Sequence, residues 1–372
     1  MPQNSHAPAP AARPSDSGPL RFFKVVLLLL ASALAGWGFQ RIGAPLPWMI
    51  GPLVLTSLVF MVLAPSMSVP DRLRPGGQVV VATQVGLAFS PAALGMLLDL
   101  APVIIGTALA SGMCIMAVAF LFARLTRQSV AQSFLSSAPT SPVEAATMAA
   151  AAGLNPVPVI FSQTVRLAAV VLVVPFALYA IEGWPDASRP PVTFDVSFQA
   201  DIVLLVVLGI AGAMIFRRLG VPNPNFLGPM TFAAVLSVAG IALTPYPLLM
   251  IAAAQIVLGS WLGAQFRREV LTTALGMSVM AIASSMLLLL LCSLCAIAIA
   301  AISGLDWKAV VLGAAPGGAV EMALTAKFLG ENVVLITTFH IVRIFIFMPS
   351  IPWIVKGLLR YDQRNDLGDK TS

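Results

Sequence analysis

Apolar segments of about 20 residues, the length that spans the hydrocarbon core of a bilayer, recur through the chain from Lys24 to Trp353. Only 10% of the 372 residues are charged, whereas soluble domains carry about 25%. Backbone polar groups in lipid must be satisfied within their own segment, and for runs of this length that means a helix. The sequence therefore predicts an all-α integral membrane protein whose surroundings are membrane lipids.

The basic residues indicate a membrane topology rather than a nucleic-acid partner. The net charge is +6, but arginines and lysines stand singly or in pairs near the ends of apolar runs, as they do in cytoplasmic loops. No basic stripe or recognition motif is present, so direct contact with nucleic acid is not expected. Cys114, Cys292 and Cys295 all fall within apolar runs, and core packing is favoured over zinc or redox use of the CxxC spacing. No metal site and no cofactor are expected.

Two ten-residue segments indicate an internal duplication. GAPLPWMIGP at 43–52 is matched by GVPNPNFLGP at 220–229, and positions 43 and 220 differ by 177. The same offset aligns APTSPVEAAT at 138–147 with APGGAVEMAL at 315–324, and no gap separates these matches. A constant offset over this length indicates two tandem copies of one unit. The first apolar run then corresponds to a run in mid-chain, so it is predicted to be a retained helix rather than a cleaved signal peptide.

Each copy contains five predicted spans and one interrupted segment. Prolines and glycines at membrane depth free backbone groups, which is tolerated only where protein or a water-filled cavity surrounds them. A weaker stretch at 130–152 is interrupted by Pro139 and Pro142, and its counterpart at 308–328 by the Pro316–Gly318 cluster. The spans of the first copy are expected at 23–40, 48–65, 78–97, 100–123 and 157–181.

Charge predicts that the two copies have opposite orientations. With the N-terminus in the cytoplasm, the loops with Arg124 and Arg127 and with Arg267 and Arg268 both lie inside, although they are not equivalent in the two copies. The predicted fold is two inverted repeats of about five transmembrane helices plus one broken or re-entrant segment each, as in many secondary transporters. Both termini are expected in the cytoplasm of a bacterium, with the protein in its inner membrane. The predicted parts are a disordered cytoplasmic tail (1–20), a first membrane repeat (21–182), a periplasmic linker (183–198), a second membrane repeat (199–360) and a cytoplasmic tail (361–372).

The two interrupted segments carry the candidate binding residues. A glutamate follows each break, Glu144 and Glu321, on the first turn of an expected half-helix whose amide end attracts negative charge. Arg166 and Arg343 lie in the last apolar run of each copy, where an ionisable residue usually faces a cavity or a partner. The predicted substrate-binding residues are Pro139, Thr140, Ser141, Glu144, Arg166, Pro316, Gly317, Gly318, Glu321, His340 and Arg343.

Structural roles compete with binding at each of these positions. The glutamates could simply cap a helix or occupy a loop, and each arginine could neutralise its neighbouring glutamate instead of contacting an anionic substrate. His340 precedes Arg343 by three residues, which places both on one helix face, and its imidazole could titrate near neutral pH. Four further residues are candidates for the same cavity, although hydrogen bonds in helix packing are favoured for them: Gln78, Thr83, Gln255 and Ser260.

The duplicated GxPxPxxxGP and APxxxVE patterns, on an apolar chain of this length, resemble the AbrB-type membrane protein family of proteobacteria, whose members contain two copies of one duplication domain. The resemblance covers nearly the whole chain except the tails. The family carries two labels, regulator of gene expression and ammonia monooxygenase. An oxygenase needs copper or iron ligands, and His6 and His340 are the only histidines, one of them in the predicted tail. Regulation would be indirect because no DNA-reading element is present.

The expected function is that of a secondary-transporter-like permease, without enzymatic activity, for a small anionic solute or an ion. The overall plan also looks like the folds of sodium/proton antiporters and bile-acid symporters, by analogy of architecture alone. A coupling ion and a homo-oligomer are left open as further partners. The alternative is a membrane sensor that affects gene expression indirectly, as the family label implies.

Overall fold

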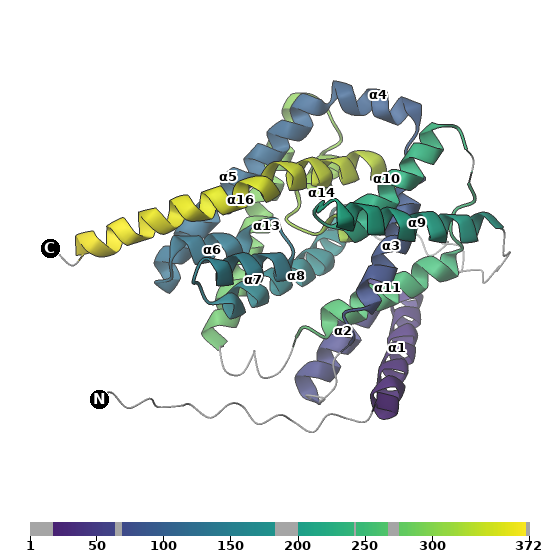
Figure 1. Cartoon of the computed structure of the whole chain (residues 1–372), viewed down its shortest axis with the longest axis horizontal. Coiled ribbons are helices and arrows are strands. Elements are labelled where there is room, and N and C mark those ends of the chain that lie inside the picture. Colours follow the sequence, from purple (N-terminus) through teal and green to yellow (C-terminus); the bar gives the residue numbers. More distant parts are fainter. Residues whose placement is uncertain (1–17, 64–68, 183–199, 242, 267–274, 370–372) are drawn as a thin grey trace.

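The computed structural model describes residues 18–63, 69–182, 200–241, 243–266 and 275–369, and its regular structure there is entirely α-helical (Figure 1). By length and composition, five of these helices can cross a membrane, so the chain has the helices of a multi-pass membrane protein. The predicted all-α class is confirmed. The five are α1 (Gly18–Arg41), α5 (Ala101–Thr126), α8 (Pro156–Glu182), α13 (Leu275–Ser303) and α16 (Val333–Asp369).

Helix boundaries recur at the 177-residue offset found in the sequence. Pro47 and Pro224 begin equivalent helices at their N1 positions, where the missing amide hydrogen costs nothing. Before them, Leu46 and Asn223 adopt the same left-handed conformation, with φ of 43° and 50°. Other helices of the first copy are α2 (Pro47–Val62), α3 (Leu73–Gly86), α4 (Pro91–Asp99), α6 (Val130–Ser137) and α7 (Pro142–Ala151). Those of the second are α9 (Ala200–Arg218), α10 (Pro224–Val238), α11 (Leu248–Gly263), α14 (Trp307–Ala314) and α15 (Ala319–Leu329).

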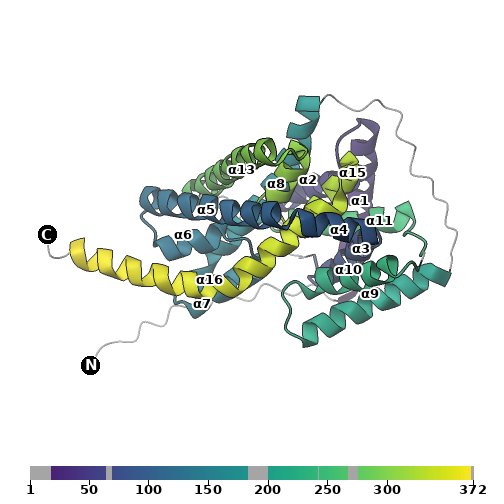
Figure 2. The ribbon, with the colours of Figure 1, turned by 90° about the horizontal axis from the view of Figure 1, so that it is seen from above.

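Reciprocal contacts between the copies form one group of helices. Helix α3 of the first copy packs on α10 of the second, and α11 of the second packs on α2 of the first. Gly86 faces the backbone of Met230 so closely that a Cβ would collide with it, and Gly263 faces Leu53 in the equivalent way. Such exchanged contacts are what a two-fold relation produces. We call α1–α3 with α9–α11 the first helix group; Figure 2 shows it at one end of the molecule.

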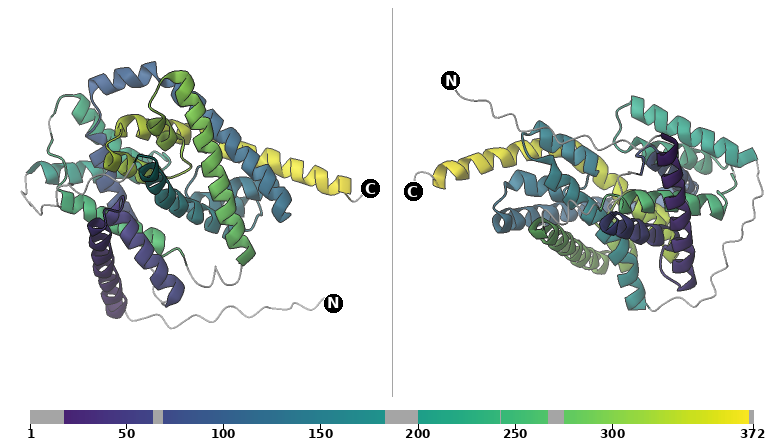
Figure 3. Two further views of the ribbon diagram at one scale, coloured as in Figure 1. Left: turned by 180° about the vertical axis from the view of Figure 1, so that it is seen from behind. Right: turned by 90° about the horizontal axis from the view of Figure 1, so that it is seen from below.

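Apart from α4, which contacts α5 and α16, the remaining helices form the second helix group, α5–α8 with α13–α16. Helix α5 packs against both α13 and α16, and α8 packs against α13. Buried side chains of this group include Phe134 and Cys292, in a cluster separate from that of the first group. The C-terminal part of α16 projects beyond the other helices (Figure 3).

Helix bounds correct one prediction and confirm another. The span expected at 78–97 is not continuous, because α3 ends at Gly86 and α4 begins at Pro91 after a bend of 89°. Ser90 starts the new helix, since its hydroxyl accepts a hydrogen bond from the Ala93 amide at 3.1 Å. The interruptions expected in both copies are present, between α6 and α7 and between α14 and α15. Of the predicted tail at 1–20, only Gly18–Leu20 are described, as the start of α1; the linker at 183–198 lies outside the described residues.

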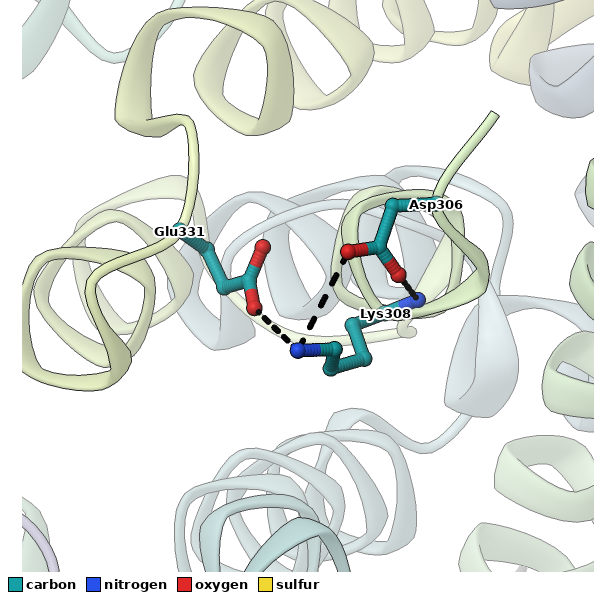
Figure 4. Close-up of polar contacts among 3 residues, drawn as sticks. All are labelled: Asp306, Lys308 and Glu331. Carbon is teal, nitrogen blue, oxygen red and sulfur yellow. Dashed lines mark hydrogen bonds and ion pairs between the residues drawn. The ribbon is translucent and has the colours of Figure 1, made fainter. Parts of the chain in front are cut away.

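The broken segments of the two copies are anchored differently. At the second, Lys308 Nζ lies 3.0 Å from Glu331 Oε1 and 3.9 Å from Asp306 Oδ2 (Figure 4). Lys308 therefore joins the start of α14 to Glu331, which follows α15. At the first, the carboxylate of Asp362 in α16 accepts hydrogen bonds from the amides of Val130 at 3.0 Å and Ala131 at 3.2 Å. Both sets of contacts hold the N-terminal end of a short helix, α14 or α6, whose C-terminal end lies at the break.

Candidate functional site

Side chains of helix α8 donate hydrogen bonds to the backbone carbonyl groups that are left without helical partners at the first break. Arg166 is only 3% exposed, and its Nη1 donates to the carbonyl oxygens of Ser137 at 2.7 Å and Ala138 at 2.8 Å. Its Nη2 donates to Gln163 Oε1 at 2.6 Å, while Gln163 Nε2 donates to Leu135 O at 2.6 Å and to Ala138 O at 3.0 Å. The last carbonyls of a helix have no partner within it, so these two side chains supply one.

The second copy repeats this network at equivalent positions. Arg343 Nη1 donates to Ala315 O at 2.7 Å, and its Nη2 donates to Gly317 O at 2.9 Å. His340 Nδ1 accepts from Arg343 Nη2 at 2.9 Å, which leaves His340 Nε2 to donate to Leu312 O at 3.0 Å. Within the described residues neither arginine forms an ion pair with Glu144 or Glu321. The hydrogen-bond partners of the arginines are therefore backbone carbonyls and the side chain three residues earlier, Gln163 or His340, and not the neighbouring carboxylates.

Each of the two arginines keeps one unused donor. The Nε atoms of Arg166 and Arg343 are buried and have no hydrogen-bond partner among the described residues. A buried donor of a charged group that stays unpaired costs about 1–3 kcal/mol or more. A further acceptor next to either Nε atom would therefore be favourable.

Both arginines line one cavity of about 210 Å³ where the two copies and the two helix groups meet. The breaks themselves form part of its wall, since Pro139 to Pro142 come from one copy and Gly317 to Val320 from the other. Of the predicted residues, Pro316 and His340 are absent from the wall, as are Thr83, Gln255 and Ser260. The predicted residues in the wall are Pro139, Thr140, Ser141, Glu144, Arg166, Gly317, Gly318, Glu321 and Arg343, together with Gln78.

The two glutamates of the wall differ in their surroundings. Glu144 forms a capping box with Ser141, and its Oε2 accepts from Ser141 Oγ at 2.8 Å and from Thr140 Oγ1 at 3.0 Å. The capping role considered for the glutamates is therefore present at this one. At the equivalent of Ser141 the second copy has Gly318, which provides no side-chain cap for α15. The Glu321 carboxylate lies over this glycine, where any Cβ would collide with it.

Three polar residues of the wall escaped sequence analysis. Arg74 in α3 attracts both Glu144 and Glu321 electrostatically, and its guanidinium lies 4.2 Å from the centre of the Trp261 ring. Asn223 and Asn225 come from the turn before α10 and its first residues. The signal that could have found them is their departure from the repeat, because their counterparts at the 177-residue offset are apolar: Ile251 for Arg74, Leu46 for Asn223 and Trp48 for Asn225.

The arrangement suits a small anion. Three arginines and two glutamates in the wall leave a formal charge of +1. The N-terminal turns of α7 and α15 also face the cavity, and helix N-termini attract anions. No group of three or more His, Cys, Asp or Glu side chains that could hold a metal ion occurs in the described parts of the chain.

Two known proteins align with most of this chain. A Bacillus subtilis (strain 168) protein named "Uncharacterized protein YhjN" is 24% identical, with 88% of this chain and 91% of that protein aligned. An Escherichia coli (strain K12) protein named "Putative regulator AbrB" is 21% identical, with 90% of this chain and 96% of that protein aligned. Residues 48–358 match the family described as "Transition state regulatory protein AbrB". The resemblance found in the duplicated motifs is thus confirmed, and the chain belongs to the AbrB family.

Proposed function

We propose that the protein is a permease of a bacterial inner membrane that moves a small anionic solute by alternating access through the cavity between its two copies. The observation that carries this proposal is the cavity wall itself, which joins three arginines and two glutamates to the N-terminal turns of α7 and α15 and has a formal charge of +1. A carboxylate or another small oxyanion in this cavity would offset the excess positive charge and meet the amide ends of both helices. No enzymatic activity is proposed.

The position of the cavity supports a transport cycle. Arg74 and Asn223 belong to the first helix group, whereas Glu144 and Glu321 belong to the second. A relative movement of the two groups would therefore open the cavity to one side of the membrane and close it to the other. Binding sites at the junction of two repeats, next to broken helices, are the common plan of secondary transporters.

Two equivalent helices support the inverted arrangement. Cys114 Sγ in α5 lies 3.6 Å from Cys295 Sγ in α13, while Phe122, further along α5, shares a cavity with Met277 near the start of α13. The two helices thus run antiparallel, as equivalent helices of inverted repeats do. Reporter fusions after Lys356 should report the cytoplasm, and fusions within 183–198 should report the periplasm. Both reporters on the same side would contradict the inverted arrangement.

Uptake into proteoliposomes tests transport directly. Purified protein is reconstituted and offered a panel of isotopically labelled small organic anions, with protein-free liposomes as the background. Arg74→Gln should reduce uptake, because it removes one positive charge from the wall without touching the arginine networks at the breaks. Arg360→Gln, which makes the same charge change at an exposed position of α16, serves as the matched control. A folded wild-type protein that takes up none of the anions would exclude the permease function for that panel.

The second candidate function is a membrane sensor, and the name of the Escherichia coli relative, "Putative regulator AbrB", favours it. A sensor needs the same anion site but no passage to the opposite side. An anion that raises the melting temperature of the purified protein, yet never accumulates in proteoliposomes, would favour the sensor over the permease.

A further inference from the structure

A second cavity, of about 320 Å³, lies between α5, α6, α8 and α13 in the second helix group. Its wall contains no charged side chain, but it is rich in hydroxyl groups. Several of these hydroxyls donate to carbonyls of their own helices, as Ser136 does to Gln132 O at 3.0 Å and Ser284 to Ala281 O at 3.0 Å. Their oxygens remain available to water. The polar residues of this wall are Thr126, Gln128, Ser133, Ser136, Ser137, Ser162 and Ser284.

The first break lies between this cavity and the central one. Ser137 lines the hydroxyl-rich cavity, and Pro139, two residues later, lines the central cavity. The carbonyl oxygen of Ser137 accepts from Nη1 of Arg166, which itself lines the central cavity. A small movement of the α6–α7 break would therefore connect the two spaces.

Among the described residues of the second copy, a phenylalanine ring fills the equivalent place. At the 177-residue offset, Ser162 is replaced by Phe339 and Ser136 by Gly313. Phe339 is only 2% exposed, and its ring packs so closely on Gly313 that a Cβ there would lie 2.6 Å from a ring carbon. Ser133 and Ser137 likewise correspond to Val310 and Ala314, both buried in an apolar cluster.

We propose that the hydroxyl-lined cavity is a water-filled vestibule through which the solute reaches the central cavity from the cytoplasmic side, and that the second copy has no counterpart on the other side. The proposal rests on the permease function. Uncharged hydroxyls can replace part of the hydration of a passing anion without holding it, whereas the arginines of the central cavity bind it.

The position of the vestibule determines the side to which it opens. Its wall includes residues at the end of α5 and near the starts of α8 and α13, namely Leu125, Pro158 and Gly276. Arg124 and Arg127, at this same end of α5, are exposed, and basic residues at the ends of spans favour the cytoplasmic face.

Thiol labelling tests the vestibule without any transport measurement. In a variant whose three native cysteines are replaced by alanine, Ser162→Cys should react with a membrane-impermeant maleimide in inside-out vesicles and not in right-side-out vesicles. The control is Val310→Cys, at the second-copy equivalent of the cavity residue Ser133, which is buried, leaves the ring of Phe339 intact and should react in neither. Reaction of Ser162→Cys from neither face or only from the periplasmic face, or equal reaction of both variants, would overturn the proposal.

Building the Gly313 and Phe339 pair of the second copy into the first tests whether the solute passes through the vestibule. The double variant Ser136→Gly with Ser162→Phe builds the glycine and ring pair that already packs well in the second copy. Anion uptake should fall to the background of protein-free liposomes, while the melting temperature is retained. Val173→Phe adds a similar bulk on the exposed face of the same helix and should leave uptake unchanged.

The outcomes separate this inference from the permease function. If the double variant Ser136→Gly with Ser162→Phe takes up the anion as fast as the wild-type protein, the vestibule proposal is overturned and the permease function is unaffected. If the wild-type protein takes up no anion, the permease fails, and the labelling of positions 162 and 310 then decides whether the cavity is an aqueous entrance to the central site.

Discussion

Replacing each buried arginine by lysine should destabilise the second copy more than the first. A lysine keeps the positive charge but is a single point donor, so it cannot reproduce the planar fork of the guanidinium. Arg343 makes hydrogen bonds shorter than 3 Å to Ala315 O, Gly317 O and His340 Nδ1, at 2.7, 2.9 and 2.9 Å. Losing two of these bonds at about 1.5–3 kcal/mol each predicts a cost of about 3–6 kcal/mol for Arg343→Lys.

Arg166→Lys should cost less because its network has a second donor. The carbonyl of Ala138 accepts from Arg166 Nη1 and also from Gln163 Nε2, at 3.0 Å, so it stays paired when the arginine is lost. His340 donates to Leu312 O and offers nothing to Ala315 or Gly317. One additional buried carbonyl is thus left unsatisfied in the second copy, which predicts a difference of about 1–3 kcal/mol between the two variants.

Equilibrium unfolding in mixed micelles, followed by tryptophan fluorescence, gives the free energy of unfolding of each variant. Arg360→Lys, at an exposed position, is the control and should change it by no more than about 0.5 kcal/mol. An Arg166→Lys variant that is as unstable as Arg343→Lys, or less stable, would refute the role assigned to the second donor. Two variants of wild-type stability would show that the carbonyls of the breaks find other partners.

Three further predictions concern the glutamates, the cysteines and the ion pair at the second break. Glu144→Gln and Glu321→Gln should leave expression near the wild-type level, since neither carboxylate forms an ion pair with Arg166 or Arg343, while altering the anion-induced shift in melting temperature; a large loss of expression in either variant would contradict this. Mild oxidation should join Cys114 to Cys295, seen on non-reducing gels after proteolysis between the copies, because their sulfurs are 3.6 Å apart and a disulfide needs about 2.05 Å. Lys308→Met should cost at most about 1 kcal/mol, and less in high salt, because the pair is partly exposed; a larger cost that salt does not change would argue against this.

The duplication made much of the fold predictable from the sequence. A single offset located both breaks, and residues that recur at it, such as Arg166 and Arg343, proved to lie together in the wall of one cavity. The same reliance on the repeat hid Arg74 and Asn223, because their counterparts are apolar. Composition also hid the bend before Pro91, since a change of direction leaves the apolar run unbroken.

The hydrogen-bond partners of the charged residues could not be read from spacing. Glutamate and arginine occur in each copy at separations that suggest an ion pair, yet the arginines donate to carbonyls whose availability depends on where α6 and α14 end. Prolines and glycines mark where each break lies, but not which side chains meet the carbonyls left free there. The attraction between Arg74 and carboxylates of the other helix group likewise depends on how the two groups pack.

The exchanged glycine contacts restrict which substitutions this chain can accept over evolutionary time. Gly86 lies against Met230 and Ala233 of the other copy, and Gly263 lies against Leu53 and Thr56. The contacts with Met230 and Leu53 are with backbone oxygens, which no substitution removes, whereas those with Ala233 and Thr56 are with side chains. In an alignment of relatives, covariation should therefore link 86 with 233, and 263 with 56, so that each copy of the duplication has evolved against the partner's surface rather than its own.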